Sequence, residues 1–571
     1  MSDVRRRRRA SSIVLAGGLA LFMGASGCGP DAAKSPESSP AAVEPAATAV
    51  AEIYRPRLRR DLGEYGRRIS SDNAEAQRYF DQGLVLCYGF NHEQAIAAFE
   101  EAARLDPDCA ICWWGVAFAY GPNINLPMSP EAGAAAWKAL GKAKELAAKA
   151  SPAERDLIDA LARRYSEDPD ADRATLDAAF AEAMGNLAEK HPKDLDVATI
   201  YAESMMNLYP WDYWTDAALP REHTQKILSV LEGVMERDPM HPGANHLYIH
   251  AVEEHFPEKG VPSADRLVTI APDAGHLVHM SSHIYWRVGR YGEAWGANVR
   301  AIDTDEDLFA WCRGGDFYRV GYYPHNLHFM WAAAAAGGQS AAAIGAARKL
   351  FESVKGYADD WPFVQEWLAI PTLTLARFGR WDAVLAGEAP PESWTFVRGM
   401  WRYTRGLAQL RRGSREEADA ELKKLDEIAA QAEMEELLVA GGTATARSIL
   451  EIASAHLSGE LAADRGDIDA AVVALQDAVD REYALVYMEP PPWYMPMRQA
   501  LGAVLLQNDR GAEAEQVFRE DLKHNPKNGW SLTGLALALE AQDKAAEAAL
   551  ARRGLAFAWE RADIALDSSR F

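Results

Sequence analysis

Two stretches near opposite ends of this chain carry the same four residue types at the same spacing: Gly83, Ala95, Phe99 and Pro107 in one, and Gly502, Ala514, Phe518 and Pro526 in the other. The small residues allow two helices to approach closely, and the phenylalanine fills the space between them. The proline ends the second helix, because its ring and its missing N–H disrupt a helix interior. A unit of this kind predicts stacked helical hairpins with few strands.

Weaker copies of the unit begin at Gly275, Gly399, Ile452 and Gly529. They keep small residues at the two close-approach positions: Ser282 and Ala294, Gly406 and Ala418, Gly459 and Ala471, and Ala536 and Ala548. The pattern resembles the tetratricopeptide repeat family, whose helix–turn–helix unit has about 34 residues. The resemblance implies an all-α solenoid with a concave surface. Segments that break the pattern, such as residues 121–127, predict irregular helical insertions.

The N-terminal 28 residues have the features of an export signal. Residues 5–9 are arginines, and residues 13–23 are apolar but too few to span a bilayer. Residues 25–28, Ala-Ser-Gly-Cys, resemble a bacterial lipobox, which implies lipidation of Cys28. We therefore predict a signal peptide over residues 1–27 and a protein held by lipid at a bacterial membrane, the outer membrane facing the periplasm. The alternative is an ordinary signal peptide cut nearby.

The composition beyond Cys28 suggests a tether followed by a folded body. Residues 29–51 are rich in Ala, Pro, Ser and Glu, and such a segment buries too little surface to order itself. We assign residues 28–72 to a tether, 73–390 to an N-terminal array and 391–571 to a C-terminal array. The net charge of −23 disfavours nucleic acid and anionic lipid surfaces as partners. Membrane contact is therefore predicted through the lipid anchor only.

Three segments of the N-terminal array carry seven histidines at helical spacing: His246 and His250; His276, His279 and His283; and His325 and His328. Residues three, four or seven apart share one face of a helix. The resemblance implies that the second and third segments occupy groove-lining positions of first helices, and such helices stand side by side in a solenoid. We therefore expect the three segments to direct imidazoles toward one volume.

Imidazole is the commonest protein ligand for transition metals, and pairs at these spacings offer two donors to one ion. Glu253 extends the face of the first pair and can add an oxygen ligand or fix a tautomer. The predicted ligands are His246, His250, Glu253, His276, His279, His283, His325 and His328. The ion would be Zn, Cu or Fe. The alternative is that the histidines line a ligand groove or sit satisfied in the core.

The cysteines form a second constellation. Cys109 and Cys112 stand at the expected start of a helix, and an oxidising compartment allows disulfides. Three interpretations remain open: a Cys109–Cys112 disulfide, a disulfide that involves Cys87, and a redox-active pair. The last lacks the βαβ pattern that a thioredoxin-like site requires.

Two classes of function fit these patterns. The sequence lacks a Gly-rich phosphate loop, a Gly-x-Ser-x-Gly elbow and a His-Glu-x-x-His motif. The first class is a lipoprotein whose concave groove binds a protein, peptide or small molecule, with the metal site in that groove. The second class is a metal-dependent enzyme, an oxidoreductase or a hydrolase, on the same scaffold. Helical repeats mostly serve binding, which favours the first.

Overall fold

The computed structural model describes residues 56–311 and 317–571. The predicted signal peptide, Cys28 and most of the predicted tether lie outside the described residues. The regular secondary structure of the described parts is almost entirely helical, as the repeat pattern predicts. Two short antiparallel strands, β1 (Leu438–Val439) and β2 (Ala444–Thr445), are the exception. Within these parts, no helix combines the length and the hydropathy that a bilayer span requires.

The first half of the body consists of α2 (Ala74–Tyr88), α3 (His92–Leu105), α4 (Ala110–Ala119), α5 (Pro130–Leu146), the short turn η2 (Ala147–Lys149), α6 (Pro152–Leu161), α7 (Arg173–Lys190), α8 (Leu195–Leu208), α9 (Thr224–Arg237), α10 (Pro242–Val252), α11 (Pro257–Ile270), α12 (Gly275–Arg287) and α13 (Tyr291–Trp311).

The second half consists of the π-helical turn η3 (Tyr318–Tyr322), α14 (Tyr323–Ala336), α15 (Ser340–Val354), η4 (Lys355–Tyr357), η5 (Pro362–Val364), α16 (Gln365–Leu368), α17 (Ile370–Arg377), α18 (Trp381–Ala386), α19 (Thr395–Arg411), α20 (Arg415–Ala429), α21 (Glu433–Glu436), η6 (Ala440–Gly442), α22 (Ala446–Asp464), α23 (Ile468–Tyr483), α24 (Met497–Gln507), α25 (Gly511–His524), α26 (Gly529–Glu540) and α27 (Ala545–Ala558).

The aromatic residues of the repeat pattern act as wedges between three helices. Phe99 on α3 is fully buried, and a Cβ added at Gly83 on α2 or at Gly115 on α4 would overlap its ring. Phe518 on α25 stands in the same relation to Gly502 on α24 and to Gly534 on α26. Each ring therefore joins the first helix of its own unit to the first helix of the next unit. This contact explains why glycine recurs at that offset.

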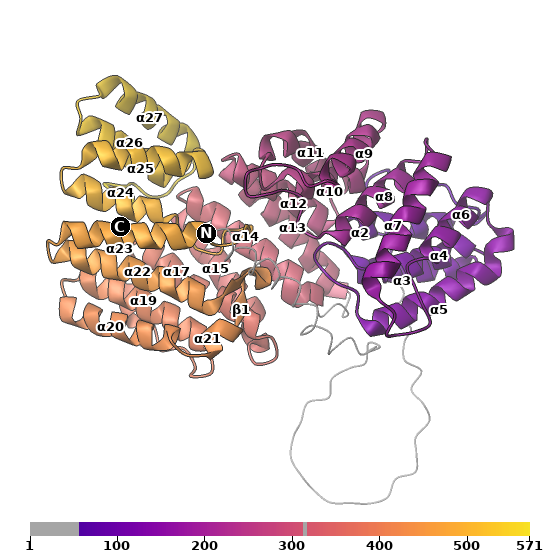
Figure 1. The fold of residues 1–571 in the computed structure, drawn as a ribbon, viewed down its shortest axis with the longest axis horizontal. Helices are drawn as coiled ribbons and strands as arrows, with labels where there is room; N and C mark the ends of the chain where they lie inside the picture. The colour runs from indigo at the N-terminus through magenta and orange to yellow at the C-terminus, as the bar shows by residue number, and fades with distance from the viewer. Residues whose placement is uncertain (1–55, 312–316) are drawn as a thin grey trace, which may run out of the picture.

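The helices that carry the histidines are neighbours in the middle of the molecule. α10, α12 and α14 each form a hairpin with the helix that follows, and α12 also contacts both α10 and α14. Figure 1 shows this central group between the early helices α2–α8 at one end and α19–α27 at the other. The stacking therefore brings the three histidine segments side by side.

Residues 56–72, which the sequence places at the end of the tether, dock onto the body. The guanidinium of Arg67 donates hydrogen bonds to both carboxylate oxygens of Asp194 at 2.7 Å and to Asp196 at 3.0 Å. The Tyr65 hydroxyl also donates to Asp196, at 2.6 Å. These buried polar contacts hold the segment against α8 in a way that its composition does not reveal. The largest apolar core includes Phe378 and Phe396, on either side of the predicted division at residue 390, so that division stays a prediction.

Candidate metal centre

Local sequence sets the two helices that carry most of the histidines. α10 begins with Pro242 in its first turn, and the His241 ring caps it by accepting a hydrogen bond from the Ala244 N–H at 3.2 Å. α12 begins at Gly275, where an added Cβ would overlap the Asp305 carboxylate of α13. Only glycine allows this close approach, which brings the first turn of α12, with His276, into the interior.

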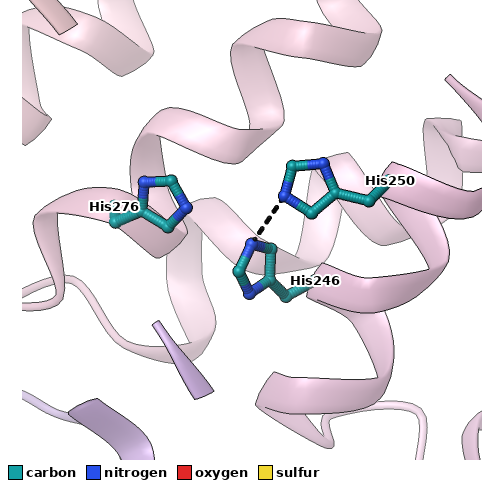
Figure 2. Close-up of side chains that lie close together, drawn as sticks. All are labelled: His246, His250 and His276. Atoms are coloured by element: carbon teal, nitrogen blue, oxygen red, sulfur yellow. Dashed lines mark hydrogen bonds between the residues drawn. The ribbon is translucent and has the colours of Figure 1, made fainter. Parts of the chain in front are cut away.

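The first histidine set joins α10 and α12. His246, His250 and His276 each offer a ring nitrogen, and these three atoms lie within 4.8 Å of one another. The Nε2 atoms of His246 and His250 are 3.1 Å apart. Figure 2 shows the three rings gathered around a common space, with the close pair marked by the dashed line. All three side chains are buried.

The second histidine set joins α12 and α14. His279, His283 and His325 offer three nitrogens that also lie within 4.8 Å of one another. The Nε2 atoms of His279 and His283 are 3.0 Å apart, and the ring centroids of His279 and His325 are 4.8 Å apart. His325 is only partly buried, so the second set is nearer to solvent than the first. The two sets adjoin, because the ring centroids of His276 and His279 are 5.6 Å apart.

Hydrogen bonds determine where the protons of four of these rings lie. His246 Nδ1 is 2.6 Å from the Tyr88 carbonyl oxygen, which can only accept, so Nδ1 carries the proton. His279 Nδ1 is 2.7 Å from Asn298 Oδ1. The Asn298 amide nitrogen donates to the Ala294 carbonyl, which identifies the atom facing His279 as the amide oxygen. This oxygen can only accept, so His279 Nδ1 carries the proton. In the neutral form of each ring, Nε2 is therefore the bare nitrogen.

Glu253 fixes the other two rings from between the sets. Its Oε1 lies 3.0 Å from His250 Nδ1, and its Oε2 lies 2.8 Å from His283 Nδ1. Burial alone would raise the pKa of Glu253, but the two imidazoles hold it well below its usual value. The ionised carboxylate therefore accepts one hydrogen bond from the Nδ1–H of each ring. Glu253 acts here by orienting the two rings, as carboxylates behind metal-bound histidines commonly do.

The close Nε2 pairs consequently bring two lone pairs together. In each pair both Nδ1 atoms hold the proton, so neither Nε2 has a hydrogen to donate to the other while both rings are neutral. A tetrahedral ion about 2.0–2.1 Å from each of two nitrogens holds them about 3.3–3.4 Å apart, close to the observed separations. A cation between the two nitrogens would satisfy both of them.

A proton shared between the two Nε2 atoms could also satisfy them, but burial disfavours a protonated ring in the first set. It lowers the pKa values of His246 and His276 well below the ordinary histidine value, and neighbouring imidazoles lower them further. Burial lowers the pKa of His250 as well, despite Glu253. In the second set, His279 behaves like His246, whereas Glu253 outweighs burial at His283 and raises its pKa.

His276 has no partner at either ring nitrogen within the described residues, although it is only 4 % exposed. Such a group costs free energy unless something binds it. Its neighbours are aromatic: Phe90 lies at a centroid distance of 5.6 Å and Tyr322 at 5.0 Å. A ring that is polar, buried and aimed at two other imidazoles has the character of a ligand rather than of core packing.

Segments far apart in sequence enclose the sets. The Phe90 ring lies 4.5 Å from that of His246, and Trp211 meets His250 edge-on at 5.1 Å. The Trp211 indole donates to the Ile124 carbonyl at 3.1 Å, so the 121–127 insertion supports this wall. Phe329 lies 4.9 Å from His283 on the other side. The sequence predicts histidines that line a groove, whereas the structure buries most of them beneath these segments.

A loop of the C-terminal half also reaches the second set. Glu489 Oε2 lies 3.4 Å from His283 Nδ1, and the Tyr487 hydroxyl donates to Oε1 of the same carboxylate. Arg287 approaches that carboxylate at 3.6 Å. Burial raises the pKa of Glu489, whereas the neighbouring His283 lowers it. Glu253, His283 and Glu489 form a third group that could hold an ion; within it His283 Nδ1 hydrogen-bonds to Glu253, whereas Glu489 Oε2 has no hydrogen-bond partner among the described residues.

The remaining predicted residues lie apart from the two sets. His328 is buried and belongs to neither set. Its ring stacks on that of Trp331 at a centroid distance of 5.4 Å, and burial lowers its pKa to about 3. Cys109 and Cys112 form a disulfide at the start of α4, whereas Cys87 is a buried free thiol.

Sequence reasoning missed several residues of the centre: Tyr88, Phe90, Trp211, Asn298 and Glu489. Phe90 and Trp211 have positive φ angles of 54° and 61°, a backbone state that their residue types do not announce. Glu489 was visible only as the start of a Pro-rich break in the repeat pattern.

Comparisons with known proteins concern the fold. No protein-family model and no curated protein sequence matches this chain. Among solved structures it is similar to the Cut9–Hcn1 hetero-tetramer of APC/C, at 12% identity and a TM-score of 0.28, over 86% of this chain and 76% of that one. It is also similar to the human IFIT1 dimer with PPP-AAAA (12%, 0.28, 85% and 91%) and to yeast Tom70 (10%, 0.27, 83% and 90%). All are tetratricopeptide-type helical-repeat proteins.

Proposed function

We propose that this helical-repeat protein binds a transition metal ion at the histidine centre between α10, α12 and α14. The observation that carries the proposal is the pair of buried Nε2 atoms of His246 and His250, 3.1 Å apart, whose protons are committed elsewhere. A core histidine in a settled role has a partner for each polar nitrogen. Here the two Nε2 atoms face one another at a distance close to that between two imidazole ligands of one transition metal ion.

The donor set narrows the choice of ion. The groups that converge are imidazoles, and the carboxylate between them, Glu253, is occupied by hydrogen bonds from two of them. Such nitrogen donors favour Zn, Cu or Fe over Mg or Ca, which prefer oxygen. Copper(II) and zinc stand highest in the usual affinity order, so they are the ions to test first.

A metal-dependent enzyme, an oxidoreductase or a hydrolase, is the second candidate function. It is favoured by one observation: three histidines gather in each set, and structural zinc sites use four protein ligands. Three protein ligands leave a coordination position for water or substrate. In such a site the ion would act as a Lewis acid or an electron carrier. The residues of this chain would hold the ion, exclude bulk water through Phe90 and Trp211, and keep the Nδ1 protons in place.

We also propose where the protein is located in the cell and what its repeat surface binds. We infer lipidation at Cys28 and a periplasmic position at a bacterial membrane, supported by the apolar run and the small residues before Cys28. A protein, peptide or small ligand would bind the concave surface of the repeats. Cys28→Ser should release the protein into the soluble fraction. Wild-type mass and membrane retention after a high-salt wash would contradict the lipid anchor.

The metal site is tested by metal analysis of protein that is stripped with chelator and then loaded with Cu or Zn. Wild type should retain metal through gel filtration, and the double variant His246→Ala/His279→Ala, which changes both histidine sets, should retain much less. His191→Ala is the matched control, because His191 caps α7 and pairs with Asp156 at 2.7 Å, away from the centre. Wild-type protein that binds no metal under any loading condition would leave the cluster as core packing and overturn the proposal.

A further inference from the structure

The donors of the centre divide into two complete sets that share no residue. The first contains His246, His250 and His276, and the second contains His279, His283 and His325. Each set has three nitrogens within 4.8 Å, and no fourth histidine among the described residues joins either set within that limit. A single ion about 2.0–2.2 Å from its ligands cannot serve both sets.

The carboxylate between the sets has the position of a shared support. Glu253 Oε1 accepts a hydrogen bond from His250 Nδ1 in the first set, and Oε2 accepts one from His283 Nδ1 in the second. Both rings therefore turn their Nδ1 sides toward Glu253 and their Nε2 atoms away from it, each toward its own set. One side chain thereby fixes a metal-binding tautomer in each set.

The third ligand of each set comes from a different helix than the close pair. In the first set, α10 supplies the pair and His276 of α12 completes it. In the second, α12 supplies the pair and His325 of α14 completes it. The same construction is thus used twice, one repeat apart. The helix α12 contributes to both sets because it packs between α10 and α14.

From this geometry we propose that the protein holds two transition metal ions, one in each three-histidine set, with Glu253 linking them. The proposal rests on the metal-binding function proposed above and adds its stoichiometry and architecture. Each ion has three protein nitrogens and an open position for a water or another small oxygen or nitrogen donor. The two open positions differ in access, because His325 is partly exposed whereas the first set is buried beneath Phe90 and Trp211.

Titration of metal-free full-length protein with Co(II) or Zn(II) tests the proposal, with the visible bands of Co(II) reporting coordination and elemental analysis reporting the number of ions. Wild type should reach a break at two ions per chain. His276→Gln and His325→Gln should each reach a break at one, and the double variant should bind neither ion tightly. Glutamine is used because it is close to histidine in size. A wild-type circular dichroism spectrum then shows that each variant is folded.

His328→Gln is the control, because His328 lies on α14 one turn from His325 but belongs to neither set. It should keep two ions. A wild-type break at one ion, lost equally in His276→Gln and His325→Gln, would overturn the two-ion centre and leave single-ion binding intact. No binding by wild type would overturn both proposals.

Discussion

Buried histidines occur in both halves of the molecule, but their surroundings are opposite. His456 on α22 of the C-terminal array receives the Tyr403 hydroxyl at Nδ1, at 2.7 Å, and its Nε2 lies 3.4 Å from Glu460. Glu460 in turn pairs with Arg411 at 2.9 Å and with Arg570 at 2.8 Å. Each charged side chain of this C-terminal cluster therefore lies beside one of opposite sign, although His456 Nε2 makes no hydrogen bond within the described residues.

The histidine centre is built differently, because imidazoles there face imidazoles. His246 and His250 place bare nitrogens 3.1 Å apart, and His276 has no partner at all within the described residues. A protein that needed these side chains only for packing would gain by replacing them with apolar ones. The comparison teaches that burial of a histidine carries little information, whereas the identity of the group opposite each ring nitrogen separates a core residue from a candidate ligand.

The largest effect that would test this comparison is expected at Glu253. Glu253→Gln should lower metal affinity by roughly 10–100-fold, because an amide can accept from only one of the two Nδ1 protons and turns its own N–H toward the other ring. Competition with a chromophoric chelator measures the affinity. Glu489→Gln is the control: Glu489 approaches only one histidine of the two sets, His283, at 3.4 Å and without a hydrogen bond from its Oε2, so its change should be smaller. Equal effects of the two variants would contradict the supporting role of Glu253.

A smaller and opposite pair of effects is expected on stability. In metal-free protein, His276→Leu should raise the free energy of unfolding by about 1–3 kcal/mol, because it removes two unpartnered buried nitrogens. His456→Leu should lower it by about 0.5–1.5 kcal/mol, because it removes the hydrogen bond between His456 and the Tyr403 hydroxyl, which then keeps only Tyr494 as a partner. Urea unfolding in the presence of chelator measures both. Changes of the same sign would remove the distinction between the two regions.

A third test concerns two carboxyl groups whose effects on stability have opposite pH dependence. Burial raises the pKa of Asp305 on α13 from 3.8 to about 7, so the folded state binds one more proton than the unfolded state between these values. Its stability therefore falls as pH rises from about 4 to 7, with a slope of about 1.4 kcal/mol per pH unit that Asp305→Asn should remove.

Glu460 behaves in the opposite way. Burial would raise its pKa, but Arg411 and Arg570 outweigh burial and hold it below the usual value of 4.5. Its contribution is present above that value and is lost as pH falls below it, and Glu460→Gln should remove this acid dependence. Chemical unfolding between pH 3 and pH 8 resolves the two windows. A stability that rises between pH 4 and pH 7 through Asp305 would contradict the assignment.

Much of the fold could be predicted from short-range patterns. Gly83 and Phe99 stand twelve and four residues on either side of Ala95, and their contact depends only on the geometry of one hairpin. The docking of Arg67 on Asp194 could not be predicted in this way, because the two residues are 127 positions apart and the segment around Arg67 has no periodic pattern. Pairings of that kind depend on the completed stack.

The features of the candidate site can be separated in the same way, into those that short-range patterns predict and those that depend on the completed fold. The sequence by itself determined which helices carry histidines, at which spacing, and that the repeat order would make α10, α12 and α14 neighbours. Only the tertiary structure decided that His328 stands apart, that six rings form two sets, and that Glu253 lies between them. The reason is physical: helical spacing determines the face on which a side chain lies, but the proton of each imidazole is placed by groups from other segments. The Tyr88 carbonyl and the Asn298 amide do this for His246 and His279, and only the folded chain brings them together.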